Sequence, residues 1–324
     1  MSEPIPYDQS MRANEALEYV LAVDVGGTKV EAALVDDRGT VLPSSRHRAP
    51  TGASATSEQL ASAVRTVILA TLASVPPGYP LIGVGIGCAG PIHLHSGAVS
   101  PLNLPVWREF GLQELVAELV PGLDVRLRMD GLCITLAEHW VGAGRGVDNL
   151  MGMIVSTGVG GGLILGGVTV SGPTGNAGHI GHIEVGGFLD ACACGGTGCI
   201  EAIASGPKTV AWARSQGFTG ESGEDLAAAY AAADPIAILA VKRSGRALGQ
   251  AIASAATLLD LDVVAIGGGF SNVTPDLLDF ARAAILERVQ FAYATRVRVV
   301  HSTLSGDGPL IGAAALIHRG ELVL

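Results

Sequence analysis

Residues 19–35 read Tyr-Val-Leu-Ala-Val-Asp-Val-Gly-Gly-Thr-Lys-Val-Glu-Ala-Ala-Leu-Val, and this stretch decides the fold of the chain. Two apolar runs flank a pair of glycines, which predicts a buried strand, a tight turn and a second, antiparallel strand. Consecutive glycines let the backbone approach a ligand closely, and the Thr28 hydroxyl can bond a phosphate. Asp24, near the end of the first strand, can hold a water of Mg²⁺. An ordinary hairpin turn explains the same residues, and the Walker pattern of P-loop nucleotide sites is absent from the sequence.

A strand followed by a glycine turn recurs twice further along the chain. The apolar runs Leu150–Val155 and Val263–Ile266 predict strands, and glycine-rich segments over 156–162 and 267–269 follow them. We expect 156–162 to be a turn that contacts phosphate, with a new strand beginning at Leu163, and 267–269 to let a base and ribose lie against the backbone. Three such turns, spread over both halves, predict a nucleotide clamped in a cleft. The expected nucleotide contacts are Asp24, Gly26, Gly27, Thr28, Lys29, Thr157, Gly158, Gly160, Gly161, Gly268 and Gly269.

The order of elements predicts an α/β protein with two domains around that cleft. Residues 1–18 are polar and irregular and predict a loose arm. Residues 19–132 are expected to form a smaller first domain, and residues 133–307 a larger second domain. A C-terminal helix, residues 308–324, is expected to pack back on the first domain.

The composition predicts a globular chain with a large core, because 48% of its 324 residues are hydrophobic and only 15% are charged. A formal net charge of −10 argues against nucleic acid and anionic membranes as partners. The mean hydropathy of +0.43 comes largely from Ala and Gly, and the apolar runs are shorter than the ~20 residues of a membrane-spanning helix. The N-terminus lacks the basic and apolar regions of a signal peptide, so we expect a cytoplasmic protein.

Asp130 is a candidate general base. It follows an alternating apolar run over 123–127 and precedes a helical pattern from Cys133 to Val141. A carboxylate at a strand-to-helix junction lies at a cleft edge near the positive helix N-terminus, where it can stay ionised and accept the proton of an attacking hydroxyl. A plain helix N-cap is the alternative interpretation of Asp130.

A group of cysteines predicts a metal site. Cys192, Cys194 and Cys199 fall within eight positions of a chain that has five cysteines. Three thiolates and one imidazole make a complete tetrahedral ligand set for Zn²⁺, and a site with no open position is expected to be structural. The segment Gly178-His-Ile-Gly-His182 supplies the imidazole, and spacing leaves both His179 and His182 open as the ligand.

Taken in chain order, these segments resemble the ROK family of bacterial sugar kinases and repressors, which belongs to the actin-like ATPase superfamily. The resemblance runs from about residue 20 to Leu316, and the cysteine signature is highly specific. It implies two RNase-H-like domains around a cleft, ATP and Mg²⁺ in that cleft, a structural zinc loop, a glucokinase-like activity and a homodimer. The matching segments are Asp24–Lys29, Gly90-Pro91, the Asp130 segment, Gly142–Gly146, Thr157–Gly162, Gly178–His182 and Cys192–Glu201.

The resemblance also implies roles for single residues. Asp130 matches the catalytic base that deprotonates the sugar's CH₂OH oxygen for attack on the γ-phosphate. His182 matches the zinc-binding histidine, which also lies close to the sugar, and Glu201 matches a sugar-binding carboxylate. Asn103, in Leu-Asn-Leu-Pro, matches a motif lining the sugar pocket, and Gly90 belongs to the same pocket.

Three positions depart from the family pattern. Met129 and Leu132 replace the amides that usually flank the base, and His179 replaces a glutamate that binds a sugar hydroxyl. Lost hydrogen-bond partners in a buried pocket cost about 1–3 kcal/mol each, so glucose should bind poorly. We therefore expect ATP-dependent phosphorylation of the primary hydroxyl of an amino-sugar such as kanosamine, or of a C7 cyclitol, in specialised metabolism such as antibiotic biosynthesis. A glucokinase with drifted sugar contacts is the alternative.

Two non-enzymatic classes are alternatives to the kinase. A repressor would need a helix-turn-helix, and the short segment before Asp24, without a basic cluster, argues against one. A non-catalytic sugar sensor would explain the altered pocket, but Asp130 and the glycine turns argue against it.

Overall fold

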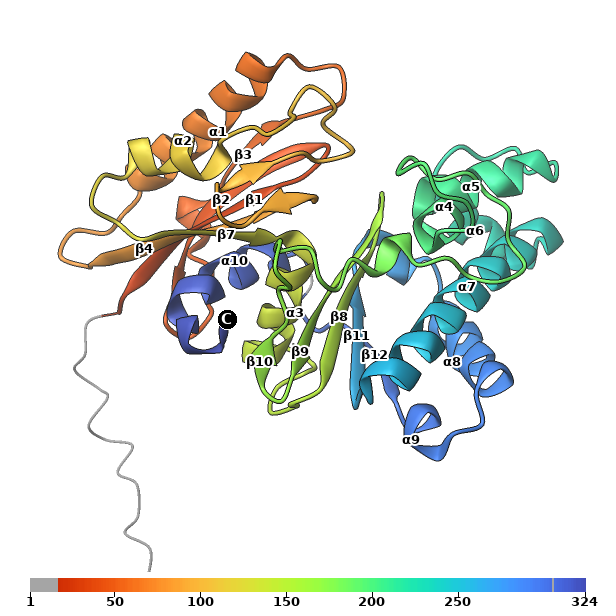
Figure 1. The fold of residues 1–324 in the computed structure, drawn as a ribbon. Helices are drawn as coiled ribbons and strands as arrows, with labels where there is room; N and C mark the ends of the chain where they lie inside the picture. Colours follow the sequence, from red (N-terminus) through yellow and green to blue (C-terminus); the bar gives the residue numbers. More distant parts are fainter. Residues whose placement is uncertain (1–16, 305) are drawn as a thin grey trace, which may run out of the picture.

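Two five-stranded sheets of the same topology carry the fold (Figure 1). The computed structural model describes residues 17–304 and 306–324, so the arm expected over 1–18 lies outside the described residues except for its last two positions. The strand orders are β3-β2-β1-β4-β7 and β10-β9-β8-β11-β12. In each sheet the first three strands pair antiparallel and the last two run parallel to the central strand. The strands are β1 (Tyr19–Val25), β2 (Lys29–Asp36), β3 (His47–Pro50), β4 (Leu81–Cys88), β7 (Val125–Met129), β8 (Leu150–Val155), β9 (Val159–Leu165), β10 (Val168–Thr169), β11 (Val263–Gly267), β12 (Arg298–His301) and, in a separate hairpin, β5 (Ile92–His93) and β6 (Ala98–Val99).

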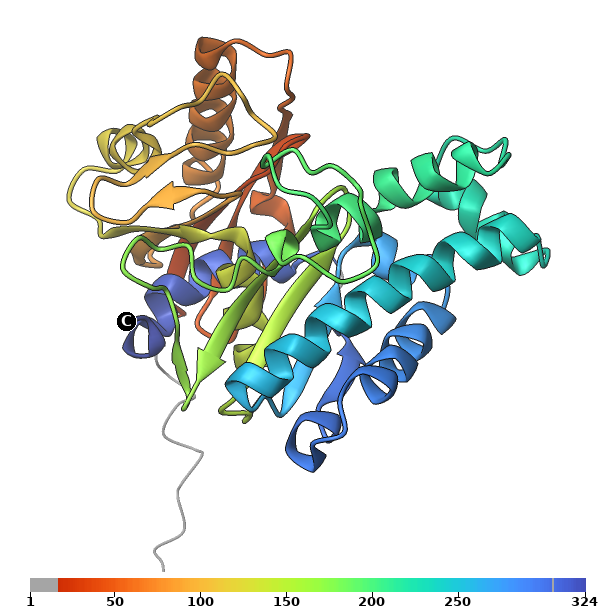
Figure 2. The ribbon, with the colours of Figure 1, turned by 45° about the vertical axis from the view of Figure 1, so that its right-hand side comes forward.

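The helices form three layers, one on the outer face of each sheet and one between the two sheets. Figure 2 shows this middle layer between the sheets. Alternate residues of each strand face opposite layers, so each sheet is apolar on both faces. Helices α1 and α2 pack on the outer face of the first sheet, α3 and α10 lie in the middle, and the long α7 covers the outer face of the second sheet. Among the described helices, none combines the length and apolar character that a bilayer span needs. The helices are α1 (Ser57–Leu72), α2 (Leu112–Leu119), α3 (Asp130–Val141), α4 (Ile200–Ala204), α5 (Gly206–Ser215), α6 (Gly223–Ala231), α7 (Pro235–Leu259), α8 (Asp276–Arg288), α9 (Ala292–Thr295) and α10 (Gly308–His318).

The middle layer is packed backbone to backbone. A β-carbon on Gly85 of β4 would fall 1.8 Å from the carbonyl oxygen of Ala313 in α10. On the other side of the same helix, a β-carbon on Gly312 would fall 1.9 Å from the carbonyl oxygen of Cys133 in α3. Glycines at these crossings let α10 contact the first sheet and α3 at once. The helix expected over 308–324 ends at His318 and is followed by a short 3-10 turn.

The glycine segment after β8 differs from the prediction. The turn comprises residues 156–158, and β9 begins at Val159, so Gly160 and Gly161 are strand residues paired with β8. Glycine inside a strand marks a close approach of another group. A β-carbon on Gly161 would fall 2.8 Å from the Ile180 side chain, which explains why this strand carries glycines without being a turn.

Candidate active site

Two cavities lie at the carboxyl ends of β1, β8 and β11. The first has a volume of about 460 Å³ and the second about 510 Å³. They adjoin, because Lys29, Ile154, Ser156 and Pro309 line both. The second cavity contains the predicted nucleotide contacts Gly268 and Gly269. The predicted site residues that line the first cavity are Asp24, Gly26, Gly27, Thr28, Lys29, Gly90, Asn103, Asp130, Thr157, Gly158, Gly160, His179, His182 and Glu201. The remaining predicted contact, Gly161, lines neither cavity, because it lies inside β9.

Asp130 is the first residue of α3, which therefore begins one turn before the helix predicted from Cys133. The N-cap residue is Met129, so Asp130 is not the N-cap that the alternative interpretation predicted. Its Oδ1 accepts a hydrogen bond from the Gly131 N–H at 2.7 Å. Burial raises the pKa of Asp130 against the effect of this hydrogen bond, and the Glu201 carboxylate adds to the rise. A buried carboxylate with a raised pKa is a better proton acceptor than an exposed one.

Asp24 lies near the end of β1 in the same cavity. Burial, and then the charge of Asp130, raise the pKa of Asp24 to about 7, while Lys29 opposes the rise. Two carboxylates that repel each other in one cavity fit a hard divalent cation, because its charge relieves the repulsion and carboxylate oxygens are the ligands that Mg²⁺ prefers. The residues present therefore fit Mg²⁺ at the Asp24 end of the cavity.

Hydrogen bonds from Thr51 fix the turn between β1 and β2. Thr51 donates from its backbone N–H to the Thr28 carbonyl oxygen at 3.0 Å and from its hydroxyl to the Gly26 carbonyl oxygen at 2.8 Å. A β-carbon on Gly27 would fall 2.5 Å from Nδ2 of Asn103. The predicted phosphate turn and the predicted acceptor residue Asn103 are therefore in direct contact. Thr51, which follows β3, carries no motif that sequence reasoning could use.

The turn between β8 and β9 is held by Glu201, at the start of α4. Oε2 of Glu201 accepts a hydrogen bond from the Val159 N–H at 3.0 Å, and a β-carbon on Gly158 would fall 2.7 Å from the same oxygen. The Ser156 carbonyl oxygen accepts from the Gly206 N–H at 2.8 Å, which ties the turn to the start of α5. Glu201 thus combines a cavity-lining position with a role in shaping the second glycine turn.

The acceptor end of the first cavity carries two histidines. The rings of His179 and His182 pack edge to face with centroids 4.6 Å apart. Burial and the neighbouring His182 lower the pKa of His179 to about 4, so its imidazole is neutral near pH 7. A neutral imidazole offers one hydrogen-bond donor and one acceptor, whereas the glutamate of the family pattern offers acceptors only.

The two apolar replacements beside Asp130 lie behind the cavity wall. Met129 is 2% exposed and Leu132 is 1% exposed, and neither lines a cavity. A β-carbon on Gly90 would fall 2.8 Å from Sδ of Met129, so this side chain supports the wall at Gly90. Apolar side chains at the end of β7 and in the first turn of α3 turn into the core, so neither replacement lines the cavity.

The predicted zinc ligands come together. The Nδ1 or Nε2 atom of His182 and the Sγ atoms of Cys192, Cys194 and Cys199 all lie within 4.8 Å of one another. Cys192 Sγ is 3.5 Å from His182 Nδ1, and Cys194 Sγ is 3.7 Å from Cys199 Sγ. Bonds of about 2.3 Å to sulfur and about 2.1 Å to nitrogen in a tetrahedral zinc site give ligand atoms about 3.5–3.8 Å apart. The cluster can hold a metal ion of this kind, and it contains His182, not His179.

The second cavity is lined by glycine backbone, by serine hydroxyl groups and by the apolar side chains of Ile134, Ile154, Ile266 and Pro309. Gly268 has a φ of 96°, and a β-carbon there would fall 2.6 Å from the Val155 carbonyl oxygen, so only glycine fits. The Ser271 hydroxyl donates to the Gly268 carbonyl oxygen at 2.7 Å and fixes this turn. The backbone exposed at Gly268 and Gly269 leaves room for a base and ribose to approach closely.

Sequence reasoning missed several polar residues of the two cavities. Ser205 and Lys208, at the start of α5, line the first cavity, and Ser271, Asn272 and Ser302 line the second. Lys208 adds a second cation to a cavity that already contains Lys29. Ser271 and Asn272 directly follow the predicted glycine segment over 267–269, so proximity in the sequence could have indicated them. Ser302 has no such signal, because it reaches the cavity only through the pairing of β12 with β11.

Comparisons with known proteins identify the family and agree with the fold. The sequence model described as the ROK family matches residues 20–320. The chain is 29% identical over 324 residues to glucokinase from Streptomyces coelicolor, covering 94% of this chain and 99% of the relative. It is 33% identical over 307 residues to N-acetylmannosamine kinase from Yersinia pseudotuberculosis, covering 91% and 96%. Its fold is similar to the crystal structure of a ROK family glucokinase from Streptomyces griseus in complex with glucose and AMPPNP, with a TM-score of 0.80 and 29% identity over 93% of this chain and 100% of that one.

Proposed function

The chain belongs to the ROK family and is a sugar kinase, and we propose that it transfers the γ-phosphate of ATP to the primary hydroxyl of a glucose-like acceptor with Asp130 as the general base. The similar S. griseus structure holds glucose and an ATP analogue, which supports ATP as the donor. The expected cofactors are Mg²⁺ near Asp24 and a structural Zn²⁺.

One observation carries the proposal: two adjoining cavities share Lys29, and Asp130 lies in only one of them. The cavity with Gly268 suits the nucleoside part of ATP. The cavity with Asp130 and Asn103 suits the acceptor. A phosphate chain that runs from one cavity to the other passes the shared residues Lys29 and Ser156, so the γ-phosphate would reach the acceptor hydroxyl next to Asp130.

The reaction needs positioning and one proton transfer. Oδ1 of Asp130 accepts a hydrogen bond from Gly131, so Oδ2 is the oxygen that takes the proton of the acceptor hydroxyl. The acceptor oxygen forms a bond to the γ-phosphorus while the bond from that phosphorus to the β–γ bridging oxygen breaks, and ADP leaves. The Lys29 ammonium group and the N–H groups of the two glycine turns stabilise the phosphate charge. Mg²⁺, when bound, supplies further charge neutralisation of the phosphates.

The acceptor is proposed to differ from glucose. His179 contributes a neutral imidazole where the family pattern has a carboxylate, and the apolar Met129 and Leu132 withdraw into the core. The remaining polar groups, including Asn103, Glu201 and His182, still line the cavity, which favours an acceptor that keeps part of the hydroxyl pattern of glucose. An amino-sugar such as kanosamine, or a C7 cyclitol, fits this description. A glucokinase with drifted sugar contacts is the second candidate, because the same three polar residues are retained.

ATP turnover over a panel of acceptors tests the proposal. The panel contains glucose, mannose, N-acetylmannosamine, 3-amino-3-deoxyglucose and a C7 cyclitol, each assayed by release of ADP with Mg²⁺ present. We expect kcat/KM to be highest for the amino-sugar or the cyclitol. A preference for glucose would establish the second candidate, and absence of turnover with every acceptor would rule out the proposed reaction.

A further inference from the structure

We propose, on the basis of the proposed kinase function, that Glu31 is a positioning residue: it holds Lys29 at the junction of the two cavities and ties it through Arg46 to the wall of the nucleotide cavity. Glu31 lies in β2 and does not line either cavity. Its effect on the reaction would pass entirely through the cations that surround it.

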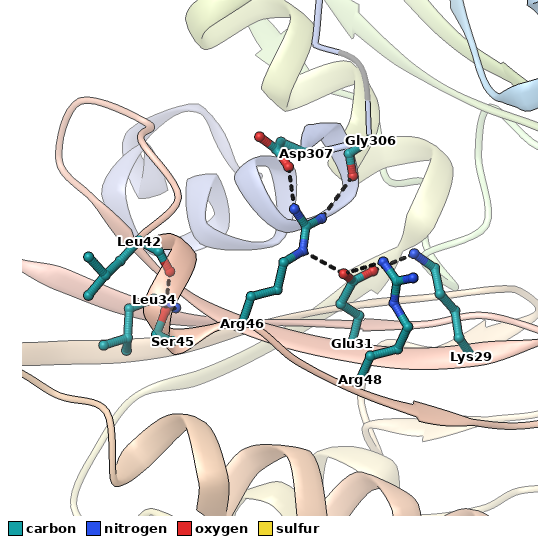
Figure 3. Close-up of polar contacts among 9 residues, drawn as sticks. All are labelled: Lys29, Glu31, Leu34, Leu42, Ser45, Arg46, Arg48, Gly306 and Asp307. Atoms are coloured by element: carbon teal, nitrogen blue, oxygen red, sulfur yellow. Dashed lines mark hydrogen bonds and ion pairs between the residues drawn. The ribbon is translucent and has the colours of Figure 1, made fainter.

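Glu31 is an unusual residue for its place in the fold. It is 2% exposed and occupies the face of β2 that points toward the middle layer, where its alternate neighbours Ala33 and Val35 are apolar core residues. A buried carboxylate is costly unless it is paired. Figure 3 shows three cations converging on it: Lys29, Arg46 and Arg48. Such a site is built for a charge, and strand packing alone would place an apolar residue there.

The contact with Lys29 gives the cluster its link to the reaction. Nζ of Lys29 pairs with Oε2 of Glu31, and Lys29 is one of the residues that line both cavities. Lysine has a long side chain with high rotamer entropy. The fixed carboxylate holds the ammonium group near the path of the phosphate chain before ATP binds, so less ordering is needed on binding.

The contact with Arg46 extends the cluster to the segment that precedes α10. Nε of Arg46 donates to Oε1 of Glu31 at 2.5 Å, Nη1 donates to Oδ1 of Asp307 at 2.6 Å, and Nη2 donates to the Gly306 carbonyl oxygen at 3.2 Å. Gly306 lines the nucleotide cavity, and Asp307 immediately precedes α10. Lys29, Glu31 and Arg46 therefore form a continuous chain of contacts from the junction to the nucleotide wall.

The charge of the cluster favours phosphate. Lys29, Arg46 and Arg48 contribute three positive charges, and Glu31 and Asp307 contribute two negative ones. The surplus positive charge stays available to an anionic chain at the junction, because Lys29 remains 37% exposed at its side chain. Glu31 thus orients Lys29 without neutralising the whole cluster.

Steady-state kinetics of a double-mutant cycle test this role. We expect Glu31→Gln to lower kcat/KM for ATP about tenfold, mainly through KM, with the KM of the sugar unchanged. In a Lys29→Ala background the same substitution should change kcat/KM for ATP no further, because its target is already gone. The control Asp279→Asn removes an exposed partner of Arg282 far from the cavities and should leave the kinetics unchanged.

A second variant and a binding measurement keep the test decisive if Glu31→Gln folds poorly. Asp307→Asn loosens Arg46 at a partly exposed residue and should raise the KM for ATP severalfold with little change in Tm. Calorimetric binding of MgADP gives the same comparison without turnover, so a wild-type protein that binds MgADP but phosphorylates no sugar would refute the proposed function alone. Additive effects of Glu31→Gln and Lys29→Ala, or a change in Tm without any change in nucleotide KM or affinity, would overturn the role of Glu31.

Discussion

Gly131, in the first turn of α3, lies directly against Gly161 of β9: a β-carbon on Gly131 would fall 2.3 Å from the Gly161 carbonyl oxygen. The contact continues along the strand, since a β-carbon on Gly162 would fall 2.5 Å from the Cα atom of Leu132. Backbone therefore meets backbone with no side chain between them. Because Asp130 immediately precedes Gly131, this contact sets where the proposed base lies relative to the turn before β9.

Gly131→Ala is expected to lower both stability and activity. The added methyl group cannot be accommodated without moving α3 away from β9, which costs about 1–3 kcal/mol or more and displaces Asp130. Denaturant unfolding and kcat measured on the folded fraction check both effects. Gly186→Ala is the matched control, because its β-carbon would meet only Nη2 of Arg288 at 3.7 Å. Equal unfolding midpoints for Gly131→Ala and the control would contradict the packing argument.

The elements that the sequence predicts well are those whose signals are local. The stretch over residues 19–35 forms β1, its turn and β2, because two apolar runs and the glycine pair between them are signals carried by neighbouring residues. The cysteine cluster was also predictable, since three of its ligands lie close together in the chain. The glycines of β9 were not predicted as strand residues. The sequence near Gly161 does not indicate that α3 packs against it, so the run of glycines predicted a turn.

The parts of the site that escaped prediction depend on distant contacts. Lys208 enters the first cavity only because α5 begins beside the turn that follows β8. In the sequence, Glu31 is an ordinary polar residue of a predicted strand. Its pairing with Arg46, which also binds Asp307 before α10, is visible only in the structure. Met129 departs from the family pattern in the sequence, but only the structure shows that its side chain lies in the core. Homodimer formation, which the family resemblance implies, remains a prediction.

Asp130→Asn is expected to lower kcat by about 10²–10⁴-fold, the usual contribution of a general base. An amide keeps the size of the carboxyl group and can still accept the Gly131 hydrogen bond, so nucleotide and sugar binding should change little. Single-turnover kinetics together with calorimetric binding of MgADP separate the two effects. A variant that binds both ligands and retains wild-type kcat would show that Asp130 is not the base.

The activity should fall on the acid side at a higher pH than an ordinary aspartate would cause. Asp130 must be ionised to take a proton, and burial raises its pKa above the usual 3.8. Protonation therefore begins at a higher pH as the solution is acidified, and kcat/KM for the acceptor declines through that range. A pH profile of kcat/KM measures this limb. The residual activity of Asp130→Asn should lack it, and an unchanged limb in that variant would assign the titration to another group.

Cys194→Ser is expected to remove the proposed zinc ion and to destabilise the segment that positions His182 and Glu201. Cys194 is exposed and makes the cluster contact with Cys199, so the substitution removes a ligand without opening a cavity in the core. Metal analysis of the purified protein and thermal unfolding check both effects. Cys88→Ala, which removes a thiol outside the cluster, should keep the zinc. Full zinc occupancy in Cys194→Ser would refute the four-ligand site.

The stabilisation provided by Glu31 should depend on pH in a defined direction. Burial alone would raise the pKa of Glu31, but the hydrogen bonds from Lys29, Arg48 and Arg46 outweigh burial and lower the pKa to about 2, from a usual value of 4.5. A carboxyl group with a depressed pKa in the folded state stabilises the fold above the unfolded-state pKa, and that contribution disappears as the pH falls from about 4.5 through about 2. Glu31→Gln should therefore have a lower free energy of unfolding than wild type at pH 7, by on the order of 2–3 kcal/mol, and a correspondingly lower Tm. The difference should shrink at pH 3, whereas Asp279→Asn should differ little from wild type at either pH. A gap between wild type and Glu31→Gln that is the same at pH 7 and pH 3 would mean that shape, not charge, is what Glu31 contributes to the fold.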